Sequence, residues 1–112
     1  MKKATAAAAR DPSRNVWLAL GLPGSEEHFL KAQLVLRLDR TIAGLKLTQS
    51  EAARLVGASQ PELSKILRGK FNEVSLERLM RFLSALGHHV EIKVGQPRKG
   101  RKGEVTINMP GA

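Results

Sequence analysis

Apolar residues recur at helical spacing in four stretches of this chain, and short polar segments separate these stretches. The longest stretch predicts a helix over residues 26–43, with an apolar face made of Leu30, Leu34, Leu38, Ile42 and Leu45. Three shorter stretches predict helices over residues 49–56, 60–68 and 76–86. Each of these three follows a residue type that favours a helix N-cap, namely Thr48, Ser59 or Ser75.

The segment after the fourth predicted helix alternates between apolar and polar residues. In "HHVEIKV" (88–94) the alternation predicts a half-buried strand, whose apolar side is Val90, Ile92 and Val94. "EVTINM" (104–109) alternates again and is a candidate second strand, joined to the first through a long basic linker. A lone strand leaves its backbone groups unpaired and invites a partner, which can be "EVTINM" of the same chain or the same strand of a second copy. The linker is longer than usual hairpin connections and carries four like charges, so we expect Val90, Ile92 and Val94 to help form a homodimer through the second pairing.

The two short helices over residues 49–56 and 60–68 are joined by a tight turn at Gly57. Helices of this length are not stable alone, so tertiary packing must hold them. Ala53 is small where the second helix crosses close to the first, and Leu63 and Ile66 can bury the joint. Helix pairs joined by glycine also occur in ordinary bundles, but here the outer side of the second helix carries no large apolar side chain. The pattern therefore predicts a helix-turn-helix that places its second helix in the major groove of DNA.

Composition and charge agree with one basic domain flanked by tails. The chain has 112 residues and a formal net charge of +9, which indicates a polyanionic partner. We expect a disordered tail over residues 1–14, the DNA-binding domain over 15–94 and a basic tail over 95–112. Residues 25–87 hold ten basic and seven acidic residues, so the expected folded part is only mildly basic. The cations of the linker, Arg98, Lys99, Arg101 and Lys102, would add nonspecific attraction to phosphates.

Several other classes of protein have little support in the sequence. The chain has no cysteine, its apolar runs are shorter than the roughly 20 residues that span a bilayer, and its N-terminus lacks the apolar core of a signal peptide. We expect a cytoplasmic protein with no membrane partner. The three histidines, His28, His88 and His89, have no suitably spaced further ligand, and no Ser/His/Asp pattern is present. We therefore expect no metal, no cofactor and no enzymatic activity.

The sole tryptophan, Trp17, allows two interpretations. It can pack with its neighbours Leu18, Leu20 and Leu22 against the first long helix, which is the simpler one. It can also anchor a partner protein, because tryptophan is enriched at the energetic centres of interfaces.

"LTQSEAARLVGASQPELSKILRGK" (47–70) resembles the helix-turn-helix of phage repressors, Cro proteins and the wider XRE-type regulators. Over residues 16–94 the chain also resembles the HigA-type antitoxins of bacterial toxin–antitoxin operons, most clearly in "QPELSKILRGK" and "LERLMRFLSALG". The resemblance implies a lambda-repressor-like, all-α helix-turn-helix bundle of four to five helices with one or two short C-terminal strands. It also implies a homodimer that binds a double-stranded DNA operator, represses its own promoter and neutralises a HigB/RelE-like ribonuclease toxin.

Two alternatives to the antitoxin stay open at this stage. Stand-alone and prophage XRE-type regulators share the same pattern without a toxin partner. A protein whose main task is to inhibit a toxin, with weak DNA binding, would also fit. A small basic ribonuclease-like gene directly beside this one would favour the antitoxin.

The resemblance and the chemistry of the side chains together assign DNA contacts. Gln60 can pair with adenine, Lys65 with guanine, and Pro61 can touch a thymine methyl group. Ser64 lies on the same side and can contact a base or a phosphate. The remaining phosphate contacts are assigned to Gln49, Ser59, Arg68 and Lys70. Glu62 could accept from cytosine N4, but the first turn of a helix favours acidic residues, so a capping role is the simpler interpretation.

Overall fold

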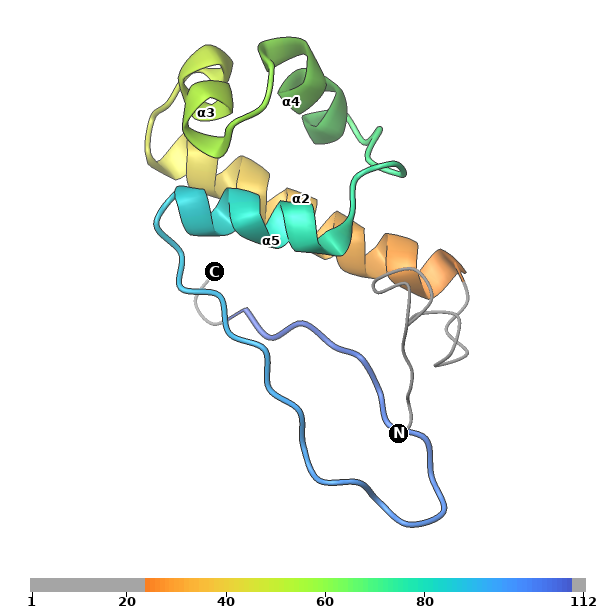
Figure 1. The fold of residues 1–112 in the computed structure, drawn as a ribbon. Helices are drawn as coiled ribbons and strands as arrows, with labels where there is room; N and C mark the ends of the chain where they lie inside the picture. The colour runs from red at the N-terminus through yellow and green to blue at the C-terminus, as the bar shows by residue number, and fades with distance from the viewer. Residues whose placement is uncertain (1–23, 110–112) are drawn as a thin grey trace.

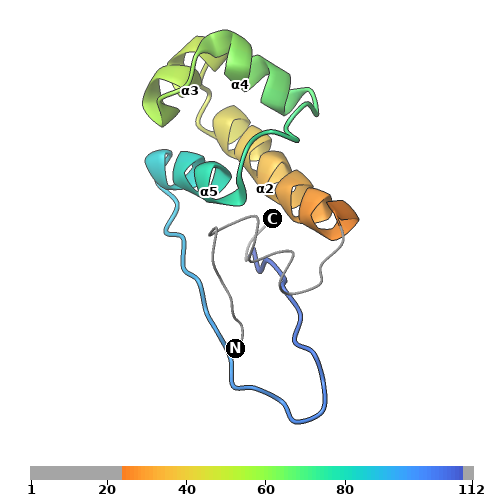
Figure 2. The same cartoon turned by 45° about the vertical axis from the view of Figure 1, so that its right-hand side comes forward.

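The computed structural model describes residues 24–109, which form four α-helices and no strand (Figure 1). Helices α2 (Gly24–Gly44) and α5 (Leu76–Ala85) lie side by side, and the shorter α3 (Gln49–Val56) and α4 (Gln60–Leu67) lie across one side of this pair (Figures 1 and 2). The expected all-α class is confirmed. The predicted helix 49–56 has the observed bounds, and the other three differ by one or two residues at their ends.

The expected tail over residues 1–14 and the segment around Trp17 lie outside the described residues. Within residues 24–109, no helix is both long enough and apolar enough to cross a membrane.

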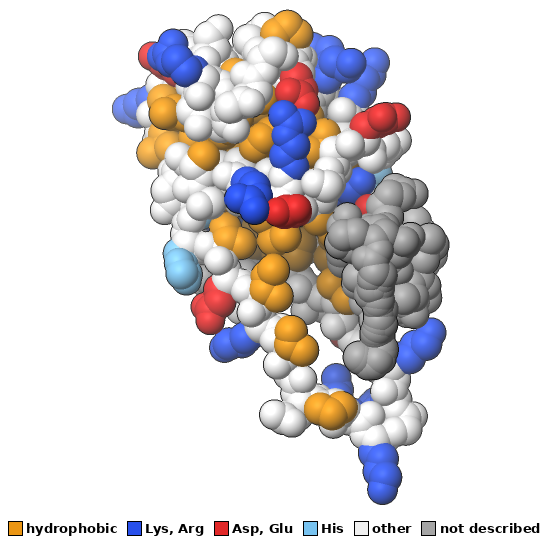
Figure 3. Space-filling model, viewed as in Figure 1, with side chains coloured by type: hydrophobic (Ala, Val, Ile, Leu, Met, Phe, Trp, Pro, Cys, Tyr) orange, Lys and Arg blue, Asp and Glu red, His pale blue; other side chains and the backbone are white. Residues whose placement is uncertain are grey.

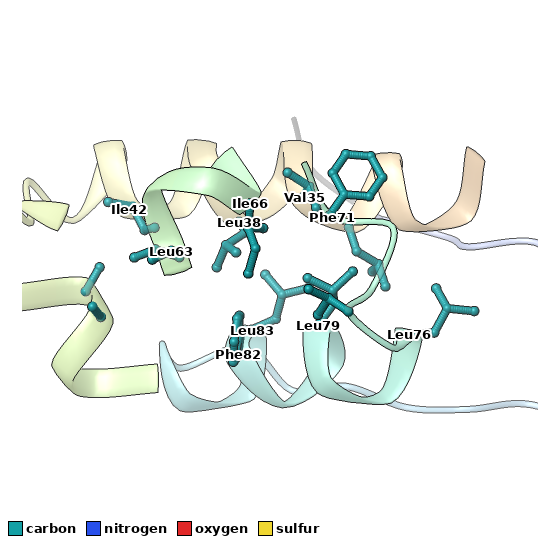
Figure 4. Packing of buried hydrophobic residues seen from close by; sticks show 14 of the residues in the cluster. Val35, Leu38, Ile42, Leu63, Ile66, Phe71, Leu76, Leu79, Phe82 and Leu83 are labelled. Carbon is teal, nitrogen blue, oxygen red and sulfur yellow. The ribbon is translucent and has the colours of Figure 1, made fainter. Parts of the chain in front are cut away.

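Apolar side chains from α2, α4 and α5 meet in one core (Figure 4). Leu38 of α2 and Leu63 of α4 are completely buried, and Phe82 of α5 is 2% exposed. Ala52 and Ala53 bring α3 onto the same core with exposures of 0% and 2%. Removing this apolar surface from water stabilises two helices that have only eight residues each.

Local signals fix where the short helices begin and end. The Thr48 hydroxyl accepts from the Glu51 N–H at 3.0 Å, and the Thr48 N–H donates to the Glu51 carboxylate at 2.8 Å, which is a reciprocal capping box. Gly57 ends α3 with a φ of 80°, a left-handed conformation that glycine adopts at least cost. The N–H groups of Gly57 and Ala58 both donate to the Ala53 carbonyl at 3.0 Å. The predicted caps at Thr48, Ser59 and Ser75 and the predicted turn at Gly57 are therefore confirmed.

The loop between α4 and α5 is anchored on α2, although its sequence has no periodic pattern. Phe71 is 5% exposed, and the His28 ring stacks on it with a centroid distance of 4.9 Å. The buried Lys31 ammonium donates to the Asn72 carbonyl at 3.0 Å and lies 3.3 Å from the Glu27 carboxylate. This loop therefore contributes Phe71 to the core and is attached to α2 by polar contacts.

The predicted strands over residues 88–94 and 104–109 are wrong. Residues 88–109, called here the C-terminal arm, leave α5, run away from the helices, turn at residues 98–101 and come back (Figure 1). Within the described chain no backbone ladder joins the two halves of the arm. Alternation fixes which side chains share a face, but a strand also needs a hydrogen-bonding partner, which neither half of the arm has within the described residues.

The two ends of the arm are attached to the helical bundle. At its root the His88 ring shares a hydrogen bond of 2.7 Å with the Thr41 hydroxyl of α2. Near its end Ile107 and Met109 pack against the core while remaining partly exposed. The apolar side chains Val90, Ile92 and Val94, between these attachments, are 38%, 73% and 90% exposed.

We expect Ala53→Leu to destabilise the domain by about 1–3 kcal/mol, because the larger side chain must fit into a filled core beside the α3–α4 turn. Thermal and urea unfolding would measure the change. Arg54→Leu, which adds the same side chain at the next, exposed position of α3, serves as the control and should stay within about 0.5 kcal/mol of wild type. An equal change in the free energy of unfolding for the two variants would contradict the burial of Ala53 in the core.

Candidate nucleic-acid interface

The three residues between α3 and α4 turn the second helix so that one side is buried and the other faces outward. Leu63 and Ile66 point into the core with exposures of 0% and 1%. The opposite side, called here the outer face of α4, consists of Gln60, Pro61, Ser64 and Lys65, of which Ser64 is partly buried and the others are exposed. The fold thus brings together all four residues that the sequence assigned to base contacts, and their role stays a prediction.

The residues assigned to phosphate contacts surround this outer face. Gln49 and Ser59 lie at the N-terminal ends of α3 and α4, while Arg68 and Lys70 follow the C-terminal end of α4, and all four are exposed. The Ser59 hydroxyl accepts from the Glu62 N–H at 3.1 Å, and its own proton remains available for a phosphate oxygen.

Two hydrogen bonds orient side chains within the interface. The Gln60 amide nitrogen donates to the Gln49 amide oxygen at 2.9 Å, which joins the first residues of the two helices. The Arg68 guanidinium donates to the Ser64 hydroxyl at 2.7 Å, one turn back along α4. Polar groups held in this way are ordered before any ligand arrives, which lowers the entropy lost on binding.

Residues 49–70 carry four basic and two acidic side chains, a formal charge of 4 − 2 = +2, and both acids are held in hydrogen bonds within the protein. In Figure 3 Lys and Arg side chains are spread over the molecule, and several of them lie at the end formed by α3 and α4. The two carboxylates in residues 49–70 belong to Glu51 and Glu62. Hydrogen bonds from the backbone and side chain of Thr48 hold the pKa of Glu51 below its usual value, so this carboxylate is ionised and bound to its own helix cap.

Glu62 binds Arg78 of α5, an interaction that sequence analysis did not predict. Both terminal nitrogens of Arg78 donate to the carboxylate, one of them at 3.0 Å to Oε1. The guanidinium also lies 5.0 Å from the centre of the Phe82 ring. This pairing lowers the pKa of Glu62, mainly through the hydrogen bond from Arg78, and raises the pKa of Arg78. The simple capping interpretation is therefore incomplete, because only the Glu62 N–H takes part in the cap.

No local signal could have revealed this pair. Ser59-x-x-Glu62 has the same spacing as Thr48-x-x-Glu51, yet only the second forms a reciprocal capping box. Sixteen residues separate Glu62 from Arg78, so the contact depends on how α4 and α5 pack.

The histidines do not gather into a metal site. His28 contacts Phe71 and Asn72, and His88 contacts Thr41. Within residues 24–109 no group of three or more His, Cys, Asp or Glu side chains is arranged to hold a metal ion.

Comparisons with known proteins agree with this geometry. Residues 18–95 match the sequence model of a family described as a helix-turn-helix domain. A solved structure assigned to the XRE family of transcriptional regulators is similar over 80% of this chain and 100% of its own chain, with 33% sequence identity and a TM-score of 0.68. No curated protein matches the chain. The matched range contains all four helices and every interface residue named above.

We expect the Glu62–Arg78 pair to stabilise the fold at neutral pH and to lose its effect in acid. The folded-state pKa of Glu62 is depressed, so the contribution is fully present above the unfolded value, about 4.3, and disappears as the pH falls through the lower folded value. Both side chains are more than a third exposed, so solvent screening limits the effect to at most about 1 kcal/mol.

Thermal unfolding of wild type and Glu62→Gln at pH 7 and pH 3 would measure this contribution. The difference between the two proteins should be present at pH 7 and should be smaller at pH 3. Glu77→Gln is the control, because the exposed Glu77–Arg81 pair joins residues of one helix and not two helices. A difference for Glu62→Gln that is as large at pH 3 as at pH 7 would contradict the assignment.

Proposed function

Because this chain belongs to the XRE-like helix-turn-helix family of DNA-binding transcriptional regulators, we propose that it is a sequence-specific repressor that binds its operator as a homodimer. The observation that carries this proposal is the outer face of α4, where three exposed side chains and the partly exposed Ser64 lie on a helix whose other side is buried. Such a helix fits the major groove, where each base pair presents its own pattern of donors and acceptors. Repression follows because a protein bound at a promoter excludes RNA polymerase.

The residues of the interface have separate roles in this proposal. Gln60 and Lys65 read base edges, with Pro61 against a thymine methyl group and Ser64 beside them. Gln49, Ser59, Arg68 and Lys70 contact phosphates on the two sides of the groove and set the position of α4. The hydrogen bond between Gln49 and Gln60 supports this division, since it couples a phosphate-contacting residue to a base-reading residue.

The proposed partner of the repressor is a HigB/RelE-like toxin encoded beside it. The support is the sequence resemblance of "QPELSKILRGK" and "LERLMRFLSALG" to HigA-type antitoxins. In the structure these segments form α4 with its following turn and α5, the two helices joined by Glu62 and Arg78. A stand-alone regulator is the alternative. Co-expression with the product of the adjacent gene distinguishes the antitoxin from the stand-alone regulator, because an antitoxin co-purifies with that product and relieves its toxicity.

The homodimer has its best support in the C-terminal arm. Val90, Ile92 and Val94 expose apolar side chains, and an open groove of about 200 Å³ lies between the arm and α5. In Figure 3 apolar side chains continue from α5 down the arm. We propose that a second copy of the chain covers these side chains. One recognition helix reads too few base pairs, and an operator with two half-sites needs two copies.

In-vitro selection of DNA by the wild-type protein should return an inverted repeat with half-sites about 34 Å apart, or a multiple of that distance.

Gln60→Ala and Lys65→Ala should each cost about 1–3 kcal/mol of binding free energy at the selected site and relax the preference at one base pair of each half-site. Arg68→Ala is the matched control for phosphate contacts, and it should weaken binding to all sequences alike and reduce the salt slope by about one per half-site. A selection that returns no inverted repeat would refute the dimeric operator, and an unchanged base preference for Gln60→Ala would refute the assigned readout.

Ile92→Ser combined with Val94→Ser should convert the protein to a monomer without unfolding it, because both side chains are largely exposed in the single chain. Analytical ultracentrifugation at micromolar concentration would measure the change, together with the loss of cooperative operator binding. Leu36→Ser on α2 also removes an exposed apolar side chain, at 51% exposure, and should leave the dimer intact. A double variant that still sediments as a dimer would move the interface onto the helices.

A further inference from the structure

A carboxylate in the first turn of α4 is held at the side of α5 and not on the outer face. Glu62 is in the first turn of the helix, and its side chain is 36% exposed. Its hydrogen-bond partner, Arg78, is 39% exposed and lies against the Phe82 ring on the other side. Arg78 thus has one face on the core of the bundle and both terminal nitrogens on Glu62.

Glu62 lies at the margin of the outer face of α4. It is three residues before Lys65, and side chains at this spacing are neighbours on a helix surface. The positive charge of Lys65 is among the causes that lower the pKa of Glu62, after the larger effect of Arg78. A Glu62 carboxylate without Arg78 would therefore have two destinations, the Lys65 ammonium or the solvent beside the outer face.

Both destinations would weaken DNA binding. In the first, Lys65 would pair with Glu62 and be lost to the DNA. In the second, a negative charge would approach the phosphate backbone, and like charges that meet across an interface oppose binding.

We propose that Arg78 is a positioning residue for DNA binding, which keeps Lys65 free and the outer face of α4 without a negative charge by binding the Glu62 carboxylate on α5. The proposal rests on the proposed function in one respect, namely that α4 is the helix that faces DNA. Arg78 itself touches no DNA. Its effect passes entirely through Glu62, which makes the role separable from that of a phosphate contact.

The change in DNA affinity when Glu62→Gln is added to an Arg78 variant distinguishes this role from a structural one. Fluorescence anisotropy with a mixed-sequence DNA duplex at low salt would compare wild type, Arg78→Met, Glu62→Gln and the double variant. Arg78→Met should lose on the order of tenfold in affinity. Glu62→Gln should stay within about twofold of wild type, and the double variant should bind within about threefold of wild type, because it has no carboxylate to release.

The neighbouring pair on α5 provides the matched control. Arg81 is three residues after Arg78, and its guanidinium lies 2.8 Å from the Glu77 carboxylate on the same helix. Arg81→Met removes the same positive charge but frees a carboxylate that is not on α4. Its loss of affinity should be about twofold or less, and adding Glu77→Gln should recover none of it.

Circular dichroism would establish that each variant is folded at the temperature of the binding measurement. If Arg78→Met fails to fold, the smaller polar change Arg78→Gln applies the same test, since a neutral side chain at this position also releases Glu62. For either Arg78 variant, adding Glu62→Gln must restore the lost DNA affinity.

Two results would overturn the proposal. The first is an Arg78 variant that binds DNA as tightly as wild type. The second is a double variant that binds as weakly as the Arg78 variant alone, which would mean that Arg78 acts by its own contact or only by pinning the helices. Failure of the proposed function would give a different set of results. In-vitro selection would then return no inverted repeat, while Glu62→Gln would still restore the affinity of the Arg78 variant for the mixed-sequence duplex.

Discussion

The burial of Leu63 and Ile66 against α2 and α5 is the interaction on which the rest of this structure depends. An eight-residue helix gains too little from its own hydrogen bonds to persist in water, so α4 exists only because this side is buried. Burial of this side of α4 also determines that the opposite side, its outer face, points to the solvent. The exposure of Gln60 and Lys65 is thus a direct consequence of the core packing. Any change that disturbs the packing will move the outer face as well.

The turn between α3 and α4 depends on the same constraint. Ala53 is buried beneath the turn, and its carbonyl accepts two hydrogen bonds from the residues that end α3. Gly57 allows the reversal because its positive φ carries little penalty. A small residue and a glycine thus let two helices approach closely enough for their N-terminal glutamines to share a hydrogen bond. The outer face of α4 and the residues around it therefore have a defined arrangement in the protein alone.

Electrostatics refines this surface without creating it. The folded helices carry only a small excess of basic residues, so bulk attraction alone would give weak and unselective binding. The fold fixes where the two acids of residues 49–70 point, Glu51 into a helix cap and Glu62 toward Arg78 of α5. Lys65 stays exposed although Glu62 is its neighbour on α4, because the Glu62 carboxylate accepts its hydrogen bonds from Arg78. The same arrangement links the position of α4 to α5 through a polar contact as well as an apolar one.

The sequence by itself determined the helices, their caps, the turn at Gly57 and the set of residues on the outer face of α4. These features follow from local periodicity and from residues such as Thr48 and Ser59 whose side chains act on their own backbone. The tertiary structure alone decided the pairing of Glu62 with Arg78, the anchoring of the loop at Phe71 and Asn72, and the unpaired state of the C-terminal arm. Each of these depends on segments that are distant in sequence, and a local pattern carries no information on which distant group will be near. The alternation in residues 88–94 shows the limit most clearly, because it describes the two faces of an extended chain while a strand is defined by its partner.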